Sequence, residues 1–139
     1  MDRKDILNHL KERYGIPEEV FQEYGFLVKG RKIWVYKKGM WIPKGKLESV
    51  GMVALRIGKE LKPTTNFIQL FGKYASKNVV EIKSEEDMKR FVNGKDIHLG
   101  IPGRGYVFVK YKEDVLGCGF LRDGVLLNLI PNDRRIKID

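Results

Sequence analysis

GYVFVKYKEDVLGCGFLRDGVLLNLIPNDRRIKID, residues 105–139, carries the strongest strand pattern of the chain. Its first seven residues alternate β-branched with aromatic side chains, and VLGCGF and VLLNLI supply two further strand patterns. KED and RDG, which separate these segments, have the composition of tight turns. We therefore predict three short strands joined by turns, followed by a tail that begins at a proline and carries two adjacent arginines.

The two glycines that flank Cys118 add a constraint on the second of these strands. A glycine inside a strand marks a point that another backbone or a ligand approaches closely. The sequence leaves both alternatives open, a neighbouring strand or a ligand. Cys118 itself is expected to be a small buried residue rather than a nucleophile, because it lies in a strand between glycines.

Two helices are expected at the start of the chain. Residues 3–13 carry a helical apolar stripe, with Asp2 in the position of an N-cap and Gly15 where the helix ends. Pro17 occupies a favoured first helical position and is followed by two acidic residues, so we predict a second helix that stops at Gly25.

Strand patterns follow. Residues 26–43 predict a hairpin that turns at residues 30–31, with another turn at residues 38–39, and the strand pattern continues to Ile57. On the strand KIWVYK, Trp34 could stack on a base, but a buried role is the favoured interpretation.

The sequence after Pro63 predicts two helices separated by a strand. Residues 64–75 predict a helix after Pro63, and residues 79–82 predict a strand. Ser84 is expected to cap a short helix, with Asp87 completing a capping box and Gly94 closing the helix. The buried side of the first of these helices is predicted from the i, i+3, i+4, i+7 spacing of Phe67, Leu70, Phe71 and Tyr74.

The positive charge of the chain is concentrated in its middle. The net charge is +9, and residues 26–83 hold thirteen basic and three acidic residues. Residues 1–25 are net negative and residues 84–139 are nearly neutral. Such a concentration is typical of proteins that bind a phosphate backbone, and a solvated lysine-rich surface is the alternative.

Composition excludes several classes of protein. With 42% hydrophobic residues the chain can form a core, and neither a run of ~20 apolar residues nor a signal-peptide pattern is present. We therefore expect a soluble, cytoplasmic monomer. One cysteine and two histidines exclude a Cys/His zinc site within one chain, and no glycine-rich nucleotide loop or catalytic motif occurs. The sequence predicts no cofactor, no metal and no enzymatic activity.

The order of these motifs resembles known RNA-binding proteins. The Gly-Tyr-Val opening, the Leu-Gly-x-Gly strand and the Asn-x-x-Pro ending of residues 105–139 resemble a PUA domain, in particular the C-terminal PUA-like module of Sun-type RNA cytosine-C5 methyltransferases. Residues 55–97 are similar to the junction in small ribosome-biogenesis proteins that place a mixed α/β "pre-PUA" domain before a PUA domain. The resemblance implies an α+β protein with a pre-PUA-like domain at residues 1–76 and a PUA-like β-barrel at residues 77–139.

Two sets of residues are candidates for binding RNA. The first set joins the basic residues of the middle segment to one face of the helix after Pro63, where amides could reach sugars or base edges and a solvated helix face is the alternative. It consists of Arg56, Lys59, Lys62, Asn66, Gln69, Lys73 and Lys77. The second set is implied by the PUA resemblance, in the loop after the helix, the IPGRG turn, the last strand and the tail. It consists of Gly94, Lys95, Asp96, Arg104, Asn128, Arg134 and Arg135.

These observations predict a non-catalytic protein that binds structured RNA, either rRNA, pre-rRNA or tRNA, in RNA modification or ribosome biogenesis. The alternative is a module that binds ribosomal proteins or a separate RNA-modifying enzyme, with an incidental basic face. A specificity subunit that presents RNA to such an enzyme would combine the two.

Overall fold

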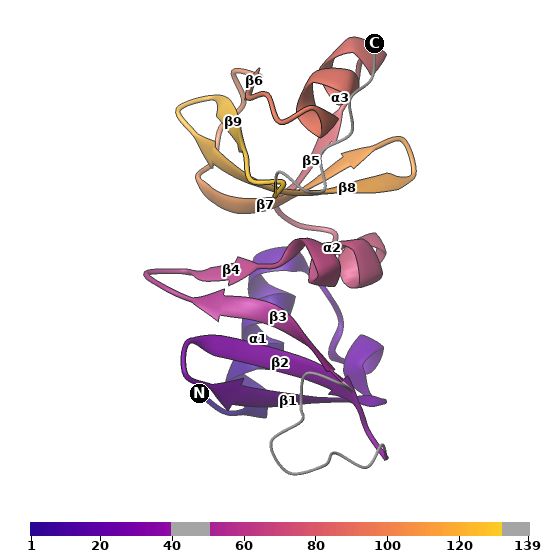
Figure 1. The fold of residues 1–139 in the computed structure, drawn as a ribbon, viewed down its shortest axis with the longest axis vertical. Coiled ribbons are helices and arrows are strands. Elements are labelled where there is room, and N and C mark those ends of the chain that lie inside the picture. Colours follow the sequence, from indigo (N-terminus) through magenta and orange to yellow (C-terminus); the bar gives the residue numbers. More distant parts are fainter. Residues whose placement is uncertain (40–50, 132–139) are drawn as a thin grey trace. The chain divides into compact units, whose positions relative to one another are not determined.

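The computed structural model describes residues 1–39 and 51–131, and the chain divides into two compact units, Met1–Lys77 and Asn78–Asp139. Each unit combines helices with one sheet, which confirms the α+β class (Figure 1). Within the described ranges, every helix is too short or too polar to span a membrane.

The N-terminal unit contains a four-stranded antiparallel sheet in the order β1-β2-β3-β4. Its strands are β1 (Tyr24–Lys29), β2 (Lys32–Lys37), β3 (Gly51–Ile57) and β4 (Leu61–Pro63). Its helices are α1 (Arg3–Tyr14), the 3-10 helix η1 (Glu18–Phe21), α2 (Thr65–Phe71) and the 3-10 helix η3 (Gly72–Tyr74).

Helix α1 begins and ends as its sequence predicts. Asp2 accepts a hydrogen bond from the Asp5 amide, and the Asp5 carboxylate accepts one from the Asp2 amide, so both parts of a capping box are present. Gly15 ends the helix in the left-handed conformation at φ 66°.

The predicted second helix is wrong. Only one 3-10 turn, η1, follows Pro17, and Gly25 lies inside β1 rather than at a helix end. A side chain at position 25 would have its Cβ 2.4 Å from the Tyr36 ring of the neighbouring strand. The glycine therefore leaves room for the Tyr36 ring in the sheet, and in sequence alone it resembles the end of a helix.

Helix α2 buries a different stripe from the predicted one. Phe67 and Phe71 are buried as expected, but Leu70 is 51% exposed and Tyr74 is 43% exposed. Ile68 is buried in their place. Within the α-helix the buried stripe therefore follows Phe67, Ile68 and Phe71, and Tyr74 lies in the following 3-10 helix, whose residues have a different angular spacing. Strand β4, immediately before this helix, is not anticipated by the sequence.

An aromatic cluster fills the space between the helices and one face of this sheet. The Phe21 ring lies 5.3 Å from that of Phe26, 6.1 Å from that of Phe67 and 5.0 Å from that of Phe71. Tyr24 meets Phe71 edge-on at 5.2 Å. Because Tyr24 and Phe26 alternate with residues of the opposite face, all helical packing lies on one side of β1.

The C-terminal unit contains a curled five-stranded sheet in the order β5-β7-β8-β9-β6, with β5 and β7 parallel and the other pairs antiparallel. Helix α3 connects β5 to β6 and covers the concave side (Figure 1). The elements are β5 (Val79–Ile82), α3 (Glu85–Val92), β6 (Ile97–His98), β7 (Gly105–Tyr111), β8 (Asp114–Arg122) and β9 (Val125–Asn128).

The glycines beside Cys118 allow a neighbouring strand to approach. A Cβ at Gly119 would lie 2.5 Å from Leu126 Cδ1 and 3.1 Å from the Leu127 carbonyl oxygen of β9. A Cβ at Gly117 would lie 3.1 Å from the side chain of Ile130. The strand alternative of the sequence prediction is therefore correct. The thiol is 1% exposed, as expected of a small buried residue.

Candidate nucleic-acid interface

The structure divides the first predicted set into two parts. Arg56 on β3 and Lys62 on β4 are direct register partners, so their side chains point to the same face of the sheet. Lys59 is exposed in the turn that joins these strands. Buried Leu55 and Pro63, which pair one position further along, point to the opposite face. The basic residues of β3 and β4 therefore project away from the helical layer.

The remaining members of the first set lie on or just after α2, which packs on the helical side of the sheet. The buried side of α2 contacts the aromatic cluster, and its outer side carries polar residues together with the exposed Leu70. The exposed members there are Asn66, Gln69, Lys73 and Lys77. These residues and the β3–β4 pair thus belong to different layers of one unit.

The loop after α3 is held in place by Asn128 of β9. The Asn128 amide group donates to the carbonyl oxygens of Phe91 and Lys95, and its own carbonyl oxygen accepts from the Ile130 amide at 2.9 Å. The Asn128 backbone amide donates to the Asp96 carboxylate at 2.8 Å.

Asn128 therefore has a structural role that the sequence does not reveal. Its amide group already binds within the protein, and it fixes the loop in which Gly94 has φ 91° and Lys95 is exposed. Direct contact of Asn128 with RNA stays a prediction, and positioning of the Gly94–Lys95 loop is what the hydrogen bonds support.

Arg104 forms part of a cation–aromatic cluster at one end of the β7–β8 hairpin. Its guanidinium carbon lies 5.3 Å from the centre of the Phe120 ring, and Tyr106 meets that ring edge-on at 5.0 Å. Arg104 is exposed, and both rings are half-buried. A planar guanidinium on an aromatic face can stack on a base or bind a phosphate. The two aromatic residues were not among the predicted site residues, although their cross-strand pairing follows from the predicted hairpin.

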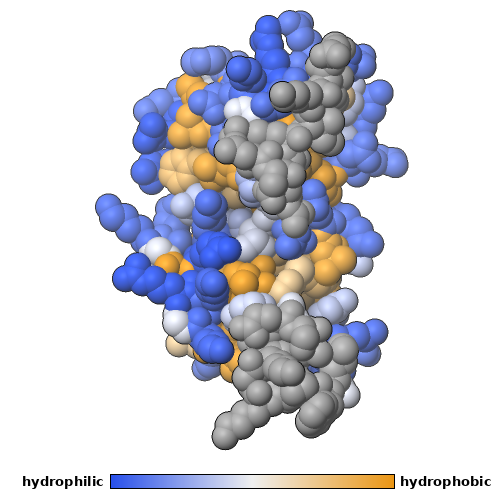
Figure 2. Space-filling model, viewed as in Figure 1, coloured by the Kyte–Doolittle hydropathy of each residue, from blue (hydrophilic) through white to orange (hydrophobic). Residues whose placement is uncertain are grey.

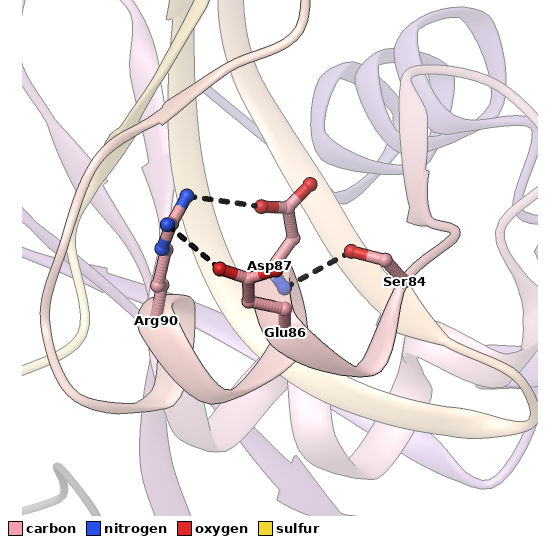
Figure 3. A network of polar contacts seen from close by, with 4 residues as sticks. All are labelled: Ser84, Glu86, Asp87 and Arg90. Carbon is pink, nitrogen blue, oxygen red and sulfur yellow. Dashed lines mark hydrogen bonds and ion pairs between the residues drawn. The ribbon is translucent and has the colours of Figure 1, made fainter.

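The N-terminal end of α3 carries a network of acidic and basic side chains (Figure 3). Arg90 binds Glu86 at 2.9 Å and Asp87 at 3.6 Å, and the Asp87 amide donates to the Ser84 hydroxyl at 3.1 Å. Ser84 caps the helix as predicted. Glu85 adds a third acidic residue to this turn and pairs with Lys89 at 3.7 Å, so each carboxylate of the turn has a basic partner on the same helix.

Two further predictions concern Trp34 and the tail. Trp34 is 8% exposed, which confirms the buried interpretation. Arg134 and Arg135 lie outside the described residues.

Two family models match the chain. Residues 77–136 match the methyltransferase RsmF PUA domain. Residues 1–51 match a family of unknown function, DUF7122. No curated protein matches the chain.

The first match agrees with the curled sheet of the C-terminal unit, so this unit is a PUA-like barrel domain. It confirms the resemblance to the PUA-like module of Sun-type methyltransferases and points to RNA binding in RNA modification. The pre-PUA resemblance of the N-terminal unit remains a prediction.

Proposed function

We propose that the protein is a non-catalytic RNA-binding protein that engages structured RNA, either rRNA, pre-rRNA or tRNA, as an accessory factor in RNA modification or ribosome biogenesis. The observation that carries this proposal is the PUA-like domain at residues 77–136. The concentration of positive charge in residues 26–83 supports it independently.

Within the PUA-like domain, two features suit RNA. Arg104 over Phe120 offers a flat cationic surface, and the Gly94–Lys95 loop is held by Asn128 with Lys95 exposed. Together they provide one stacking contact and one phosphate contact on rigid supports.

A substitution at Arg104 tests this proposal. The Arg104→Gln variant is expected to bind a fluorescently labelled tRNA or rRNA hairpin roughly threefold to thirtyfold more weakly, because it loses a partly desolvated cation–aromatic contact. Lys112→Gln is the matched control, since Lys112 lies 5.4 Å from the Tyr111 ring at the opposite end of the same hairpin. Equal affinity of both variants and the parent chain would exclude Arg104 from the interface, and absence of binding by the parent chain would refute RNA binding itself.

A protein-binding role is the second candidate, and one pocket favours it. A pocket of about 390 Å³ opens in the PUA-like domain between β5, the start of α3 and the segment before β7. Its floor is apolar and its rim carries both charges, as is common in protein interfaces. The lining residues are Val79, Val80, Glu81, Lys83, Ser84, Asp87, Leu99 and Ile101. In a specificity subunit this pocket would bind the RNA-modifying enzyme or a ribosomal protein.

A Leu99→Asp variant separates the two roles. It places a charge on the apolar floor of the pocket, so it is expected to abolish co-purification of a protein partner while leaving the affinity for the RNA hairpin within twofold. A parallel loss of RNA affinity would show that the pocket belongs to the RNA interface.

A further inference from the structure

Four basic side chains lie in one row across the sheet of the N-terminal unit. Lys29 of β1 pairs with Lys32 of β2, Lys32 pairs with Arg56 of β3, and Arg56 pairs with Lys62 of β4. Directly paired residues of antiparallel strands point to the same face of a sheet. Each of the four strands therefore contributes one basic side chain to the same row, which we call the basic strip: Lys29, Lys32, Arg56 and Lys62.

The charges of the basic strip are not compensated by the described part of the chain. Lys29, Lys32 and Arg56 are exposed, and Lys62 is half-buried. None of the four forms an ion pair with a described residue, whereas ion pairs such as Arg90–Glu86 lie in the other unit. Strands β1 to β4 contain no acidic residue, and Glu60, in the β3–β4 turn, makes no ion pair with a described residue.

Such a row of like charges destabilises the folded sheet when nothing is bound to it. Like charges directly opposite each other on neighbouring strands are destabilising, and the strip contains three such pairs in succession. Lysines on edge strands can protect a sheet from aggregation, which could account for Lys29 and Lys62. Edge protection does not account for Lys32 and Arg56, because they lie on the two central strands.

The strip faces away from the helices of its unit. Phe26 contacts Phe21 and the Arg3 guanidinium on the helical side of β1, and Lys29, three positions later, points to the other side. Figure 2 shows hydrophilic side chains projecting from the end of this sheet where Figure 1 places the β1–β2 and β3–β4 turns. Neither α1 nor α2 therefore covers the strip.

We propose that the basic strip binds the sugar–phosphate backbone of an RNA strand. Three interstrand gaps give the row a length of about 14 Å. One isolated phosphate would engage one or two of these side chains, whereas a nucleic-acid strand presents a charge at every nucleotide and can neutralise all four. This inference rests on the proposed function and assigns part of the RNA contact to the N-terminal unit, including two residues, Lys29 and Lys32, outside the predicted set.

Salt-dependent RNA binding by the full chain tests the strip. The probe is a fluorescently labelled RNA hairpin with a single-stranded extension, titrated at several KCl concentrations. In the Lys32→Gln/Arg56→Gln variant, the slope of log affinity against log salt is expected to fall by about 1.4–1.8, since each lost phosphate contact removes ~0.7–0.9. The thermal midpoint of this variant is expected to equal or exceed that of the parent chain, because each of the three like-charge pairs loses at least one of its charges.

The control is Lys4→Gln/Lys11→Gln, which removes the same charge from exposed positions of α1 on the helical side of the sheet. Its salt slope is expected to match that of the parent chain. An equal fall in both double variants, or no fall in either, would overturn the strip while leaving RNA binding intact. If the parent chain itself fails to bind the hairpin, the proposed function fails as well.

A second variant keeps the test decisive if the first one does not fold. Lys29→Gln/Lys62→Gln alters only the outer strands and is expected to lower the slope by the same amount. An unchanged slope in this variant would restrict phosphate binding to the central strands and overturn the four-residue strip.

Discussion

Gly119 illustrates how one missing side chain fixes the packing of a whole hairpin. Its Cα faces Leu126, which is fully buried, and the Leu127 carbonyl, which belongs to the backbone of β9. Neither neighbour can yield without moving the strand. Position 119 therefore accepts no Cβ at the observed separation of β8 and β9.

We expect Gly119→Ala to lower the free energy of unfolding of the C-terminal unit by about 1–3 kcal/mol, through overpacking. Chemical denaturation monitored by near-UV circular dichroism measures the change. Gly58→Ala is the control, because a Cβ at position 58 would have only an ordinary contact of 3.7 Å, with the Glu60 carbonyl oxygen. If both variants lose the same stability, steric crowding by β9 is not the cause.

His9 makes the stability of the N-terminal unit depend on pH. Burial lowers the pKa of its imidazole below the ordinary value of 6.5, the nearby Arg13 lowers it further, and Glu12 opposes both. Its Nε2 is buried without a hydrogen-bond partner, and its ring meets Tyr14 edge-on at 6.0 Å. The folded state therefore favours neutral His9.

The unfolded chain binds a proton at His9 at a higher pH than the folded chain does. Stability from this residue is fully present above pH 6.5 and declines as the pH falls toward the lowered pKa. We expect unfolding free energies measured between pH 7.5 and about 5 to decline less in His9→Gln than in the parent chain. The hydrogen bond from the Asp5 amide lowers the pKa of Asp2 below 3.8. Protonation of Asp2 therefore changes the stability only at more acidic pH. Parallel pH profiles for the two proteins would contradict the assignment.

At the scale of elements, local signals predicted most of the fold. Capping residues at Asp2 and Ser84 identified two helices, and alternation with turn residues identified the hairpins. The errors occurred where a distant contact determines the local structure. Gly25 has the composition of a helix end, but it lies inside β1 against the Tyr36 ring of the neighbouring strand. Strand β4 has only three residues and is defined by its pairing with β3, so no local sequence pattern predicts it.

The candidate site was less predictable for a related reason. Arg56 and Lys62 were identified from charge, but their alignment with Lys29 and Lys32 depends on register across three strand pairs. A bulge between Ile33 and Trp34 shifts that register, and the sequence does not reveal where such a shift falls. The hydrogen bonds of Asn128 to the loop after α3 likewise join segments more than thirty residues apart.

Helix α2 and the turn after it provide a prediction at this scale. Reversing two exposed charges there, in Lys73→Glu/Lys77→Glu, is expected to weaken binding of the RNA hairpin by tenfold or more at low salt and to leave pull-down of a protein partner intact. Lys4→Glu/Lys11→Glu, on α1, is the matched control. Unchanged RNA affinity would exclude this surface from the RNA contact. Of the first predicted set, only the residues of the sheet would then remain candidates for binding RNA.

For the whole molecule, the two units differ in charge. Residues 1–77 carry sixteen basic and eight acidic residues, whereas residues 78–139 carry eleven and ten. Nonspecific attraction to phosphates is therefore expected mainly from the N-terminal unit, and shape recognition from the PUA-like domain.

The N-terminal unit is expected to fold as a separate fragment if it is cut after Lys77. The backbone amides of Ser76 and Lys77 donate to the Tyr14 carbonyl oxygen at 2.8 and 3.1 Å, and the Ser76 hydroxyl donates to that of Gly15 at 3.3 Å. A fragment ending at Tyr74 loses these bonds, at a cost of about 1–3 kcal/mol. Thermal unfolding of the two fragments measures the difference. Equal midpoints would show that the connection to α1 contributes no stability.

The parallel pairing of β5 with β7 has a consequence for folding kinetics. Strands β7, β8 and β9 are consecutive and can form a meander from neighbouring residues, but Val79 of β5 pairs with Phe108, after α3 and β6 have intervened. Closing this long loop costs conformational entropy, and this cost is offset only when the contacts between β5 and β7 have formed. We expect β5 to join its sheet late, so on the ribosome the segment at the start of the PUA-like domain would remain unpaired until β7 has emerged.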